Sequence, residues 1–134
     1  MNSSSRTLSA GEAADLVRVT ARAVGRAGLS HAYGHCSARL DENTFVVSPA
    51  KPMGLVTAQD NPVTVPVRGP LPSGALGEVR LHQQIYRRRA DVRGIVRYQS
   101  PRIMSLSSLG RTPLADTASA ATSLRKHLSG ATRA

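Results

Sequence analysis

Residues 77–101 read GEVRLHQQIYRRRADVRGIVRYQSP, and their hydrophobic period changes halfway. In the first half, apolar and aromatic side chains recur at helical spacing, so a helix is predicted over residues 78–89. In the second half, the apolar pair Ile95-Val96 predicts a strand over residues 93–98. A helix that leads directly into a strand is typical of α/β proteins, in which the two kinds of element form packed layers.

The residues before this stretch begin with a second helix. Ser9 and Glu12 have the spacing of a capping box, in which each residue bonds the backbone of the other. Apolar residues behind them recur at helical spacing up to Gly28, a residue type that often ends a helix. A helix is therefore predicted over residues 10–27.

Short strands are predicted between the two helices, because apolar and β-branched runs there are brief and bounded by turn residues. The last of them has a proline on either side, which restricts it to an edge or a brief pairing. A loop is predicted at residues 30–37, and the strands at residues 38–40, 44–48 and 63–65.

A third helix is predicted over residues 101–109, because a Ser-Pro pair begins it. The order helix, strands, helix, strand, helix predicts one α/β domain over residues 9–110. A Ser-rich, disordered N-terminal tail is predicted at residues 1–8 and a weakly structured or helical C-terminal tail at residues 111–134.

Composition limits the partners of the chain. Its 134 residues are 40 % hydrophobic, and they contain one cysteine, so an intrachain disulfide is excluded. The sequence shows no secretory signal and no apolar run near the roughly 20 residues of a membrane span. Together with the single cysteine, these features predict a cytoplasmic protein. The net charge of +10 is typical of nucleic-acid binding, but the arginines are scattered and only 3 % of residues are aromatic. The charge fits a carboxylate- or phosphate-bearing partner, or a plain Arg-rich surface, better than nucleic acid.

Three segments, GHCSAR at residues 34–39, EVRLHQQIY at 78–86 and IVRYQSP at 95–101, together resemble the class II aldolase/adducin family. Family members carry Gly-(Asn or His)-x-Ser-x-Arg, then Glu-x-x-x-His-x-x-Ile-Tyr, then a strand ending in His-x-His before Ser-Pro. The order and spacing make the match specific. The resemblance implies an α/β/α layered fold with a central, mainly antiparallel sheet flanked by helices. It also implies a homo-oligomer, possibly a tetramer.

The resemblance also implies a divalent metal, often zinc, held by three histidines. Two of them come from the His-x-His, where this chain has Arg97 and Gln99. A guanidinium stays protonated and offers no lone pair, and an amide oxygen is a weak ligand for zinc. No metal ligand and no cofactor are therefore predicted.

The resemblance assigns proton transfer to Glu78. Arg97 would place a fixed charge where the family keeps its metal, and it can hold a substrate carboxylate or stabilise an enolate oxygen. Gln99 is two residues along the strand and is predicted to face the same cleft. The alternative for Arg97 is a solvated strand-end residue left after the metal site decayed.

Substrate binding is implied for four further residues. Gly34, His35 and Ser37 match a loop that contacts the phosphate or carboxylate of family substrates, and Ser48 matches a second contact loop. His35 can equally be a donor that stabilises the loop. The remaining histidine of the motif, His82, lies on an apolar helix face, which favours a hydrogen-bonded core residue over a ligand.

Two functions remain open at this point. The family's sugar-phosphate enzymes carry Ser-Ser before the glutamate, whereas this chain has Leu76-Gly77, so a carboxylate- or carbonyl-bearing substrate is favoured. The leading hypothesis is a lyase, decarboxylase, dehydratase or isomerase that acts through an enolate-like intermediate. The alternative is a non-catalytic, adducin-like or degenerate interaction or structural domain.

Overall fold

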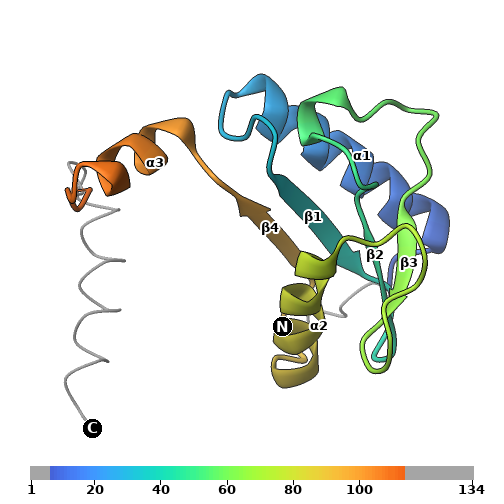
Figure 1. Cartoon of the computed structure of the whole chain (residues 1–134). Helices are drawn as coiled ribbons and strands as arrows, with labels where there is room; N and C mark the ends of the chain where they lie inside the picture. The colour runs from blue at the N-terminus through green and yellow to red at the C-terminus, as the bar shows by residue number, and fades with distance from the viewer. Residues whose placement is uncertain (1–6, 114–134) are drawn as a thin grey trace, which may run out of the picture. The chain divides into compact units, whose positions relative to one another are not determined.

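The computed structural model describes residues 7–113 (Figure 1). By its internal contacts the chain divides into a unit that ends at Pro101 and a second that begins at Arg102, and each is described by itself. The elements in chain order are α1 (Ala10–Arg26), β1 (Gly34–Arg39), β2 (Thr44–Val47), η1 (Met53–Leu55), β3 (Val63–Pro66), η2 (Gly77–Val79), α2 (Arg80–Arg88), β4 (Gly94–Tyr98) and α3 (Pro101–Ser108), where η marks a 3₁₀ turn.

The four strands form one antiparallel sheet in the order β3-β2-β1-β4. The predicted antiparallel sheet is therefore confirmed. β1 is an inner strand, with Ser37 opposite Val47 of β2 and His35 opposite Arg97 of β4. β3 lies at the edge, as its flanking prolines predicted.

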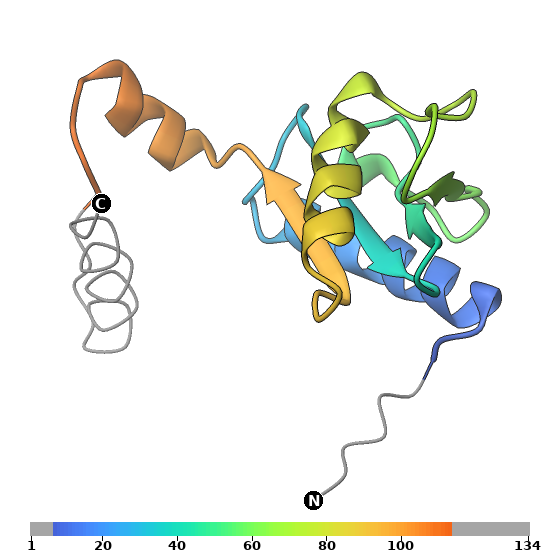
Figure 2. The same ribbon diagram turned by 90° about the horizontal axis from the view of Figure 1, so that it is seen from below.

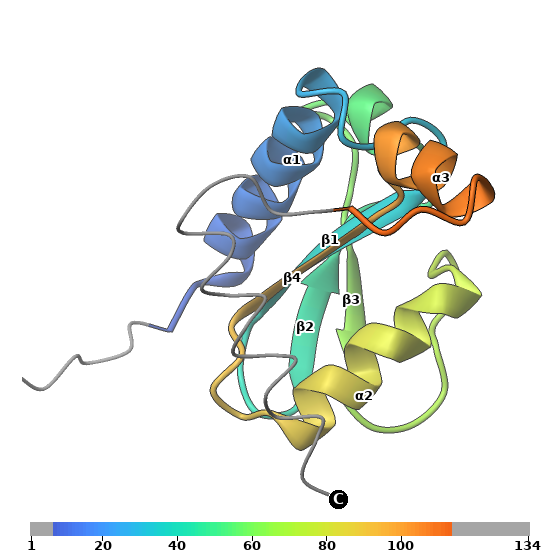
Figure 3. The same cartoon turned by 90° about the vertical axis from the view of Figure 1, so that its left-hand side faces the viewer.

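The sheet lies between α1 and α2 (Figures 2 and 3). Successive residues of a strand point to opposite faces, so β1 contributes to both layers. Cys36 and Ala38 belong to the core that α1 covers, while His35 and Ser37 contact residues of α2 on the other face. This arrangement confirms the layered α/β/α fold. The core under α1 comprises Ala13, Val17, Ala21, Cys36, Ala38, Val46, Met53 and Val56, and the core under α2 comprises Phe45, Val47, Val65, Val67, Val79 and Tyr86.

Helix α1 begins with the predicted capping box. The backbone N–H of Ser9 donates to Glu12 Oε2 at 2.9 Å, and the backbone N–H of Glu12 donates to Ser9 Oγ at 3.2 Å. The helix ends at Arg26, and Gly28 adopts the positive φ of 67° that makes glycine a common stop.

The loop predicted at residues 30–37 is wrong in its second half. β1 begins at Gly34, and the backbone from Gly34 to Ala38 pairs with β4. The segment does not resemble a core strand, because His35 and Ser37 are polar. They are buried all the same, because side chains of α2 satisfy their hydrogen bonds. The strand expected at residues 38–40 is the end of this longer one.

The helix predicted over residues 78–89 is divided. Gly77–Val79 forms a 3₁₀ turn, and the α-helix runs only from Arg80 to Arg88. The helix predicted at residues 101–109 is confirmed as α3, which is followed by Gly110 at a φ of 64°. Most of the tails predicted at residues 1–8 and 111–134 lies outside the described residues. No helix within residues 7–113 has the length and apolarity that a membrane crossing requires.

The end of α1 and the turn η1 approach each other through two glycines. A Cβ atom added to Gly25 would lie only 2.3 Å from Gly54 Cα, whereas one added to Gly54 would lie an ordinary 3.5 Å from Gly25 Cα. The contact holds η1 beside the helix, and Met53 of η1 is completely buried in the core.

Candidate active site

A pocket of about 240 Å³ lies at the start of β1, beside the end of β4 and the turn before α2. It brings together four of the predicted site residues, namely Gly34, His35, Glu78 and Arg97. The other lining residues are Ala32, Tyr33, Ala50, Lys51, Pro52 and Leu76.

Strand register places Arg97 beside His35. The two residues are directly opposite in the antiparallel pair of β1 and β4, and such residues point to the same face of a sheet. The pKa of His35 is lowered, first by burial and then by the charge of Arg97, while the charge of Glu78 acts in the opposite direction. His35 therefore lies within electrostatic reach of both a cation and an anion that line the same pocket.

Glu78 is held in place by its neighbour in the turn η2. Its own side chain is exposed, but Val79 is buried in the core beneath α2. Leu76, on the other side of the turn, lines the pocket where the family's sugar-phosphate enzymes have a serine. The turn therefore offers one carboxylate and one apolar side chain to the pocket, and no hydroxyl.

Gly34 is required by packing. A Cβ atom at this position would lie 2.7 Å from Met53 Cε, 2.8 Å from Arg97 O and 2.9 Å from Ser30 Oγ. Its φ of 152° also suits glycine better than other residues. The glycine of the motif lets the start of β1 pass close to β4 at the pocket.

Lys51 is a pocket residue that the sequence reasoning missed. Its Nζ donates to both carboxylate oxygens of Asp60, at 2.8 and 2.9 Å. The hydrogen bond from Lys51, followed by one from the backbone of Thr57, lowers the pKa of Asp60 to about 2. The sequence does contain a signal for Lys51 as a site residue. It is the charged residue nearest to Ser48, in a segment that the resemblance marks as a contact loop.

The other three predicted site residues do not line this pocket. Ser37 is buried, with its Oγ 2.6 Å from His82 Nδ1 and 2.8 Å from the Tyr86 hydroxyl. Ser48 is also buried, and its Oγ accepts the backbone N–H of Cys36 at 3.2 Å. Gln99 is half-buried and follows the last residue of β4. Substrate contact by these three residues stays a prediction.

A row of buried polar side chains lies behind the pocket. His35 Nδ1 is 2.7 Å from His82 Nε2, and His82 continues to Ser37 and Tyr86. The row forms because positions 35 and 37 share a strand face while positions 82 and 86 share a helix face. Burial, then the neighbouring His35 and Arg97, lowers the pKa of His82 to about 3, so its imidazole is neutral. The prediction that His82 is a hydrogen-bonded core residue is confirmed.

One atom of this row lacks a partner. His35 Nε2 is the only buried side-chain nitrogen or oxygen among residues 7–113 without a hydrogen bond. Such an atom costs about 1–3 kcal/mol unless something in its surroundings satisfies it. His82 occupies the other ring nitrogen, and Nε2 is itself buried from solvent.

Cys36 does not offer a nucleophile. Its side chain is 1 % exposed, and its Sγ lies 3.4 Å from the backbone oxygen of Val17. Burial raises the pKa of the Cys36 thiol to about 11, which leaves almost no thiolate at neutral pH.

The residues of the pocket do not fit the metal site that the family implies. Within residues 7–113, no group of three or more His, Cys, Asp or Glu side chains is arranged to hold a metal ion. Arg97 occupies the strand position opposite His35, and its guanidinium has no lone pair to donate.

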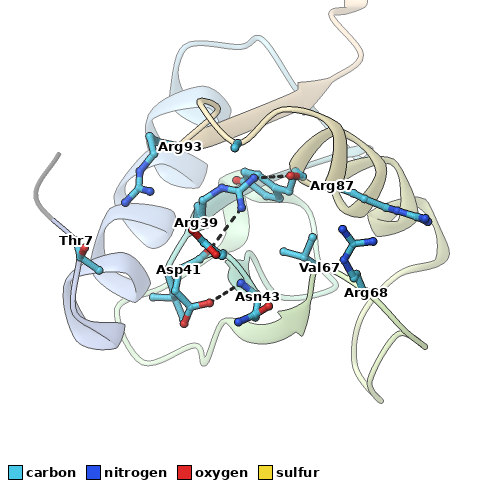
Figure 4. A pocket seen from close by; sticks show the side chains of 12 residues that line it. Thr7, Arg39, Asp41, Asn43, Val67, Arg68, Arg87 and Arg93 are labelled. Atoms are coloured by element: carbon cyan, nitrogen blue, oxygen red, sulfur yellow. Dashed lines mark hydrogen bonds between the residues drawn. The ribbon is translucent and has the colours of Figure 1, made fainter.

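A second hollow, of about 590 Å³, opens at the far end of β1 around Arg39 (Figure 4). The exposed arginines Arg68, Arg87 and Arg93 also line it, and none of the predicted site residues does. The Arg39 guanidinium donates to the backbone oxygens of Tyr86, Val92, Arg89 and Asp41, at 2.6, 2.9, 3.1 and 3.3 Å. The arginine of the Gly-His-x-Ser-x-Arg motif therefore supports the fold and is remote from the predicted pocket.

An antiparallel sheet between two helices, with an acid and a cation in one pocket, is the arrangement expected of an α/β domain of the class II aldolase type. The chain belongs to the family described as the Class II Aldolase and Adducin N-terminal domain, whose sequence model matches residues 14–131. Comparison with curated protein sequences found no match.

Solved structures show the same relationship. The L-fuculose 1-phosphate aldolase from Glaciozyma antarctica superposes with a TM-score of 0.61 at 27 % identity, over 77 % of this chain and 45 % of that one. The L-fuculose-1-phosphate aldolase from Thermus thermophilus superposes with a TM-score of 0.59 at 26 % identity, over 71 % of this chain and 50 % of that one. The chain thus spans about half the length of these aldolases.

Proposed function

We propose that this chain is an aldolase-like small-molecule enzyme that forms an enolate-like intermediate without the usual zinc. The observation that carries the proposal is the shared pocket of Glu78, Arg97 and His35. A proton-transfer group, a fixed cation and a polar ring are the parts that this chemistry needs.

In a lyase step, the Glu78 carboxylate accepts the proton of a substrate hydroxyl. The O–H electron pair forms a new C=O bond, the neighbouring C–C bond breaks, and its electron pair produces an enolate whose oxygen faces Arg97. Glu78 then returns the proton to the enolate carbon. One C–C bond is broken and one C–H bond is formed, with no net change in protons. Decarboxylation, dehydration and isomerisation share the same intermediate.

The lining favours a substrate with a carboxylate or carbonyl group. Arg97 can hold such a group through two N–H donors, while Lys51 is already paired with Asp60. Leu76 offers no hydroxyl to a phosphate. The names of the two similar aldolases nevertheless make L-fuculose 1-phosphate the competing substrate to test first.

The test compares Glu78→Gln with the wild-type protein on L-fuculose 1-phosphate and on a set of hydroxy- and ketocarboxylates. We expect turnover on a carboxylate and a loss of about 100-fold or more in the variant, the usual contribution of a positioned acid or base. Glu42→Gln, at an exposed turn remote from the pocket, is the matched control. Equal turnover of the wild-type protein and Glu78→Gln would refute the proposed role of Glu78.

A non-catalytic, adducin-like domain is the second candidate. It is favoured by the missing metal-ligand group among residues 7–113 and by a family that includes adducins. Failure of the wild-type protein to turn over any compound in the set, together with no carboxylate binding at the pocket, would support it.

The assembly and location are part of the proposal. We propose a cytoplasmic homo-oligomer, possibly a tetramer, as the family resemblance implies. Light scattering coupled to size exclusion measures the mass, and a species equal to one 14.2 kDa chain would contradict the oligomer.

A further inference from the structure

A third hollow, of about 320 Å³, lies between α2 and the loop that follows β3, and we call it the α2 hollow. Its charged lining residues are Arg68 of the loop and Arg80 and Arg87 of α2, and its lining contains no carboxylate. Arg68 and Arg87 also line the hollow around Arg39, and Figure 4 shows their side chains together on one side of that hollow. The α2 hollow shares no residue with the pocket that contains Glu78.

Helical spacing places the two arginines of α2 on one face. Positions 80, 84 and 87 follow each other at intervals of four and three residues, which is the spacing of neighbours along a helix surface. Arg80, Gln84 and Arg87 are all exposed, so this face presents two guanidinium groups with an amide between them. The two arginines are separated by roughly 10 Å along the helix axis, which is the rise of about two turns.

The loop that carries Arg68 is fixed beside this face. Gln83 is buried, and its Nε2 donates to the backbone oxygens of Pro66 at 2.8 Å and Gly69 at 3.2 Å. Val67, next to Arg68, is 4 % exposed and belongs to the core beneath α2. The backbone on both sides of Arg68 is therefore held against α2, whereas the Arg68 side chain is exposed.

The three guanidinium groups are not neutralised by the fold. Within residues 7–113, none of Arg68, Arg80 and Arg87 forms a salt bridge. Cations around one hollow repel each other, and an anion with several charges placed among them would replace this repulsion by attraction. A guanidinium keeps its charge in proteins, and its planar fork of N–H donors matches the oxygens of phosphate and carboxylate groups.

The spacing of the charges favours an extended anion. A single phosphate between Arg80 and Arg87 would require both long side chains to bend toward it and to lose rotamer freedom, because they begin roughly 10 Å apart along the axis. A chain of two or three phosphates covers more of that distance and carries more charge. The volume of the α2 hollow, about 320 Å³, is also in the range of small-molecule pockets.

Two larger occupants fit this hollow less well. Single-stranded nucleic acids bind by stacking their bases on aromatic side chains, and the lining of the α2 hollow contains no aromatic residue. A second copy of this chain would bring a net charge of +10 toward the arginines, which opposes the contact.

We propose that Arg68, Arg80 and Arg87 bind a small molecule that carries a diphosphate or triphosphate group. Gln84, between the two arginines of α2, can add the N–H donors of its amide. The site is separate from the candidate active site, so the proposal does not depend on the enzymatic activity proposed above.

The experiment is a calorimetric titration of the full chain with sodium tripolyphosphate at neutral pH and constant ionic strength. We expect the wild-type protein to bind, and Arg68→Gln, Arg80→Gln and Arg87→Gln each to weaken binding about 5- to 10-fold, because each removes one charge and its N–H donors. All three side chains are exposed, so the variants should fold, which circular dichroism checks.

Arg88→Gln is the matched control. Arg88 is exposed on the same helix and lines neither basic hollow, so this variant loses the same charge from outside the site. It should change the affinity less than about twofold, as is usual for an exposed charge without a direct contact. No binding by the wild-type protein, or equal losses in all four variants, would overturn the proposal.

Other anions test the choice of ligand. Orthophosphate should bind about tenfold more weakly than tripolyphosphate, because it reaches fewer arginines. Citrate, which carries its charges in a more compact molecule, should also bind more weakly. Equal affinity for either anion would overturn the choice of a phosphate chain. A short single-stranded RNA that binds more tightly than tripolyphosphate, and needs the same arginines, would identify a nucleic-acid surface in its place.

Arg97→Gln tests the location. Arg97 lines the candidate active site and not the α2 hollow, so its replacement should leave the tripolyphosphate affinity unchanged. A loss of binding in Arg97→Gln, with binding retained in the three variants of the α2 hollow, would place the anion in the candidate active site and overturn the separate site.

Discussion

Arg39 holds Tyr86 in two ways. Its guanidinium donates to the backbone oxygen of Tyr86 at 2.6 Å, and its central carbon lies 4.6 Å from the centroid of the tyrosine ring. The backbone oxygens of Tyr86 and Arg89 belong to the end of α2, where carbonyl groups have no partner within the helix. Arg39 therefore ties the end of β1 to the end of α2, and it packs against the tyrosine ring whose hydroxyl is hydrogen-bonded to Ser37.

Replacement of Arg39 by lysine should destabilise the fold. An ammonium keeps the charge but has three donors and no planar fork, so it cannot reproduce all four hydrogen bonds, of which the one to the Tyr86 oxygen is buried. We expect a loss of about 2–4 kcal/mol in the free energy of unfolding, measured in urea. Arg93→Lys, on an exposed side chain at the same hollow, should cost less than about 0.5 kcal/mol. Equal effects of the two substitutions would show that Arg39 does not cap α2.

Gly25→Ala should lower the melting temperature, although alanine is the better helix former by about 1 kcal/mol. The reason is the new Cβ atom, which would lie 2.3 Å from Gly54 Cα and force the turn η1 away from α1. Gly54→Ala is the matched control, because its Cβ atom would meet Gly25 Cα at 3.5 Å. Equal melting temperatures for the two variants would contradict the close approach.

Acid should weaken the fold well above the range in which carboxylates titrate. His82 has a pKa of about 3 in the folded protein and about 6.5 when unfolded, so the unfolded chain binds more protons between these values. Stability should therefore fall as the pH is lowered below about 6.5, by up to ~1.4 kcal/mol per pH unit for this one group. Urea unfolding between pH 7 and 4.5 measures the slope. His82→Gln should flatten it, and an equal slope in that variant would mean that another group is responsible.

Metal removal should leave the protein unchanged. Arg97 and Gln99 replace the two strand histidines of the family, and residues 7–113 offer no group of three ligands. We expect much less than one transition metal per chain by elemental mass spectrometry and no shift in melting temperature with a chelator. One tightly bound metal per chain, with melting lowered on its removal, would restore metal-dependent lyase chemistry and overturn the role proposed for Arg97.

Local sequence signals predicted the elements that local chemistry determines. The Ser9–Glu12 capping box and Gly28 delimit α1 within one residue, because helix ends depend on a few neighbouring groups. The start of β1 at Gly34 was not predictable in this way. A strand that carries His35 and Ser37 on a buried face is stable only because α2 supplies the hydrogen-bond partners, and such partners are distant in sequence.

The candidate site was likewise predictable in part, with its residues indicated by the sequence but not all of their contacts. The family resemblance predicted Glu78, Arg97 and His35 as site residues, and all three line one pocket. It also assigned Ser37 to substrate contact, which stays a prediction, and in the fold the hydroxyl of Ser37 links His82 to Tyr86. The sequence does show that His35 and Ser37 are two residues apart on a strand and that His82 and Tyr86 are four residues apart on a helix. That the strand pair contacts the helix pair follows only from the tertiary packing of α2 on the sheet, which local sequence does not reveal.

The burial of Cys36 has a practical consequence. It is the only cysteine of the chain, it is 1 % exposed, and its thiol has a raised pKa of about 11. A maleimide dye should therefore leave the folded protein unlabelled and react only when β1 separates from α1. The chain thus contains its own reporter of unfolding, and the labelling rate would measure how often this interface opens without any engineered probe. The same inertness would let a second cysteine, introduced on the surface, be labelled alone.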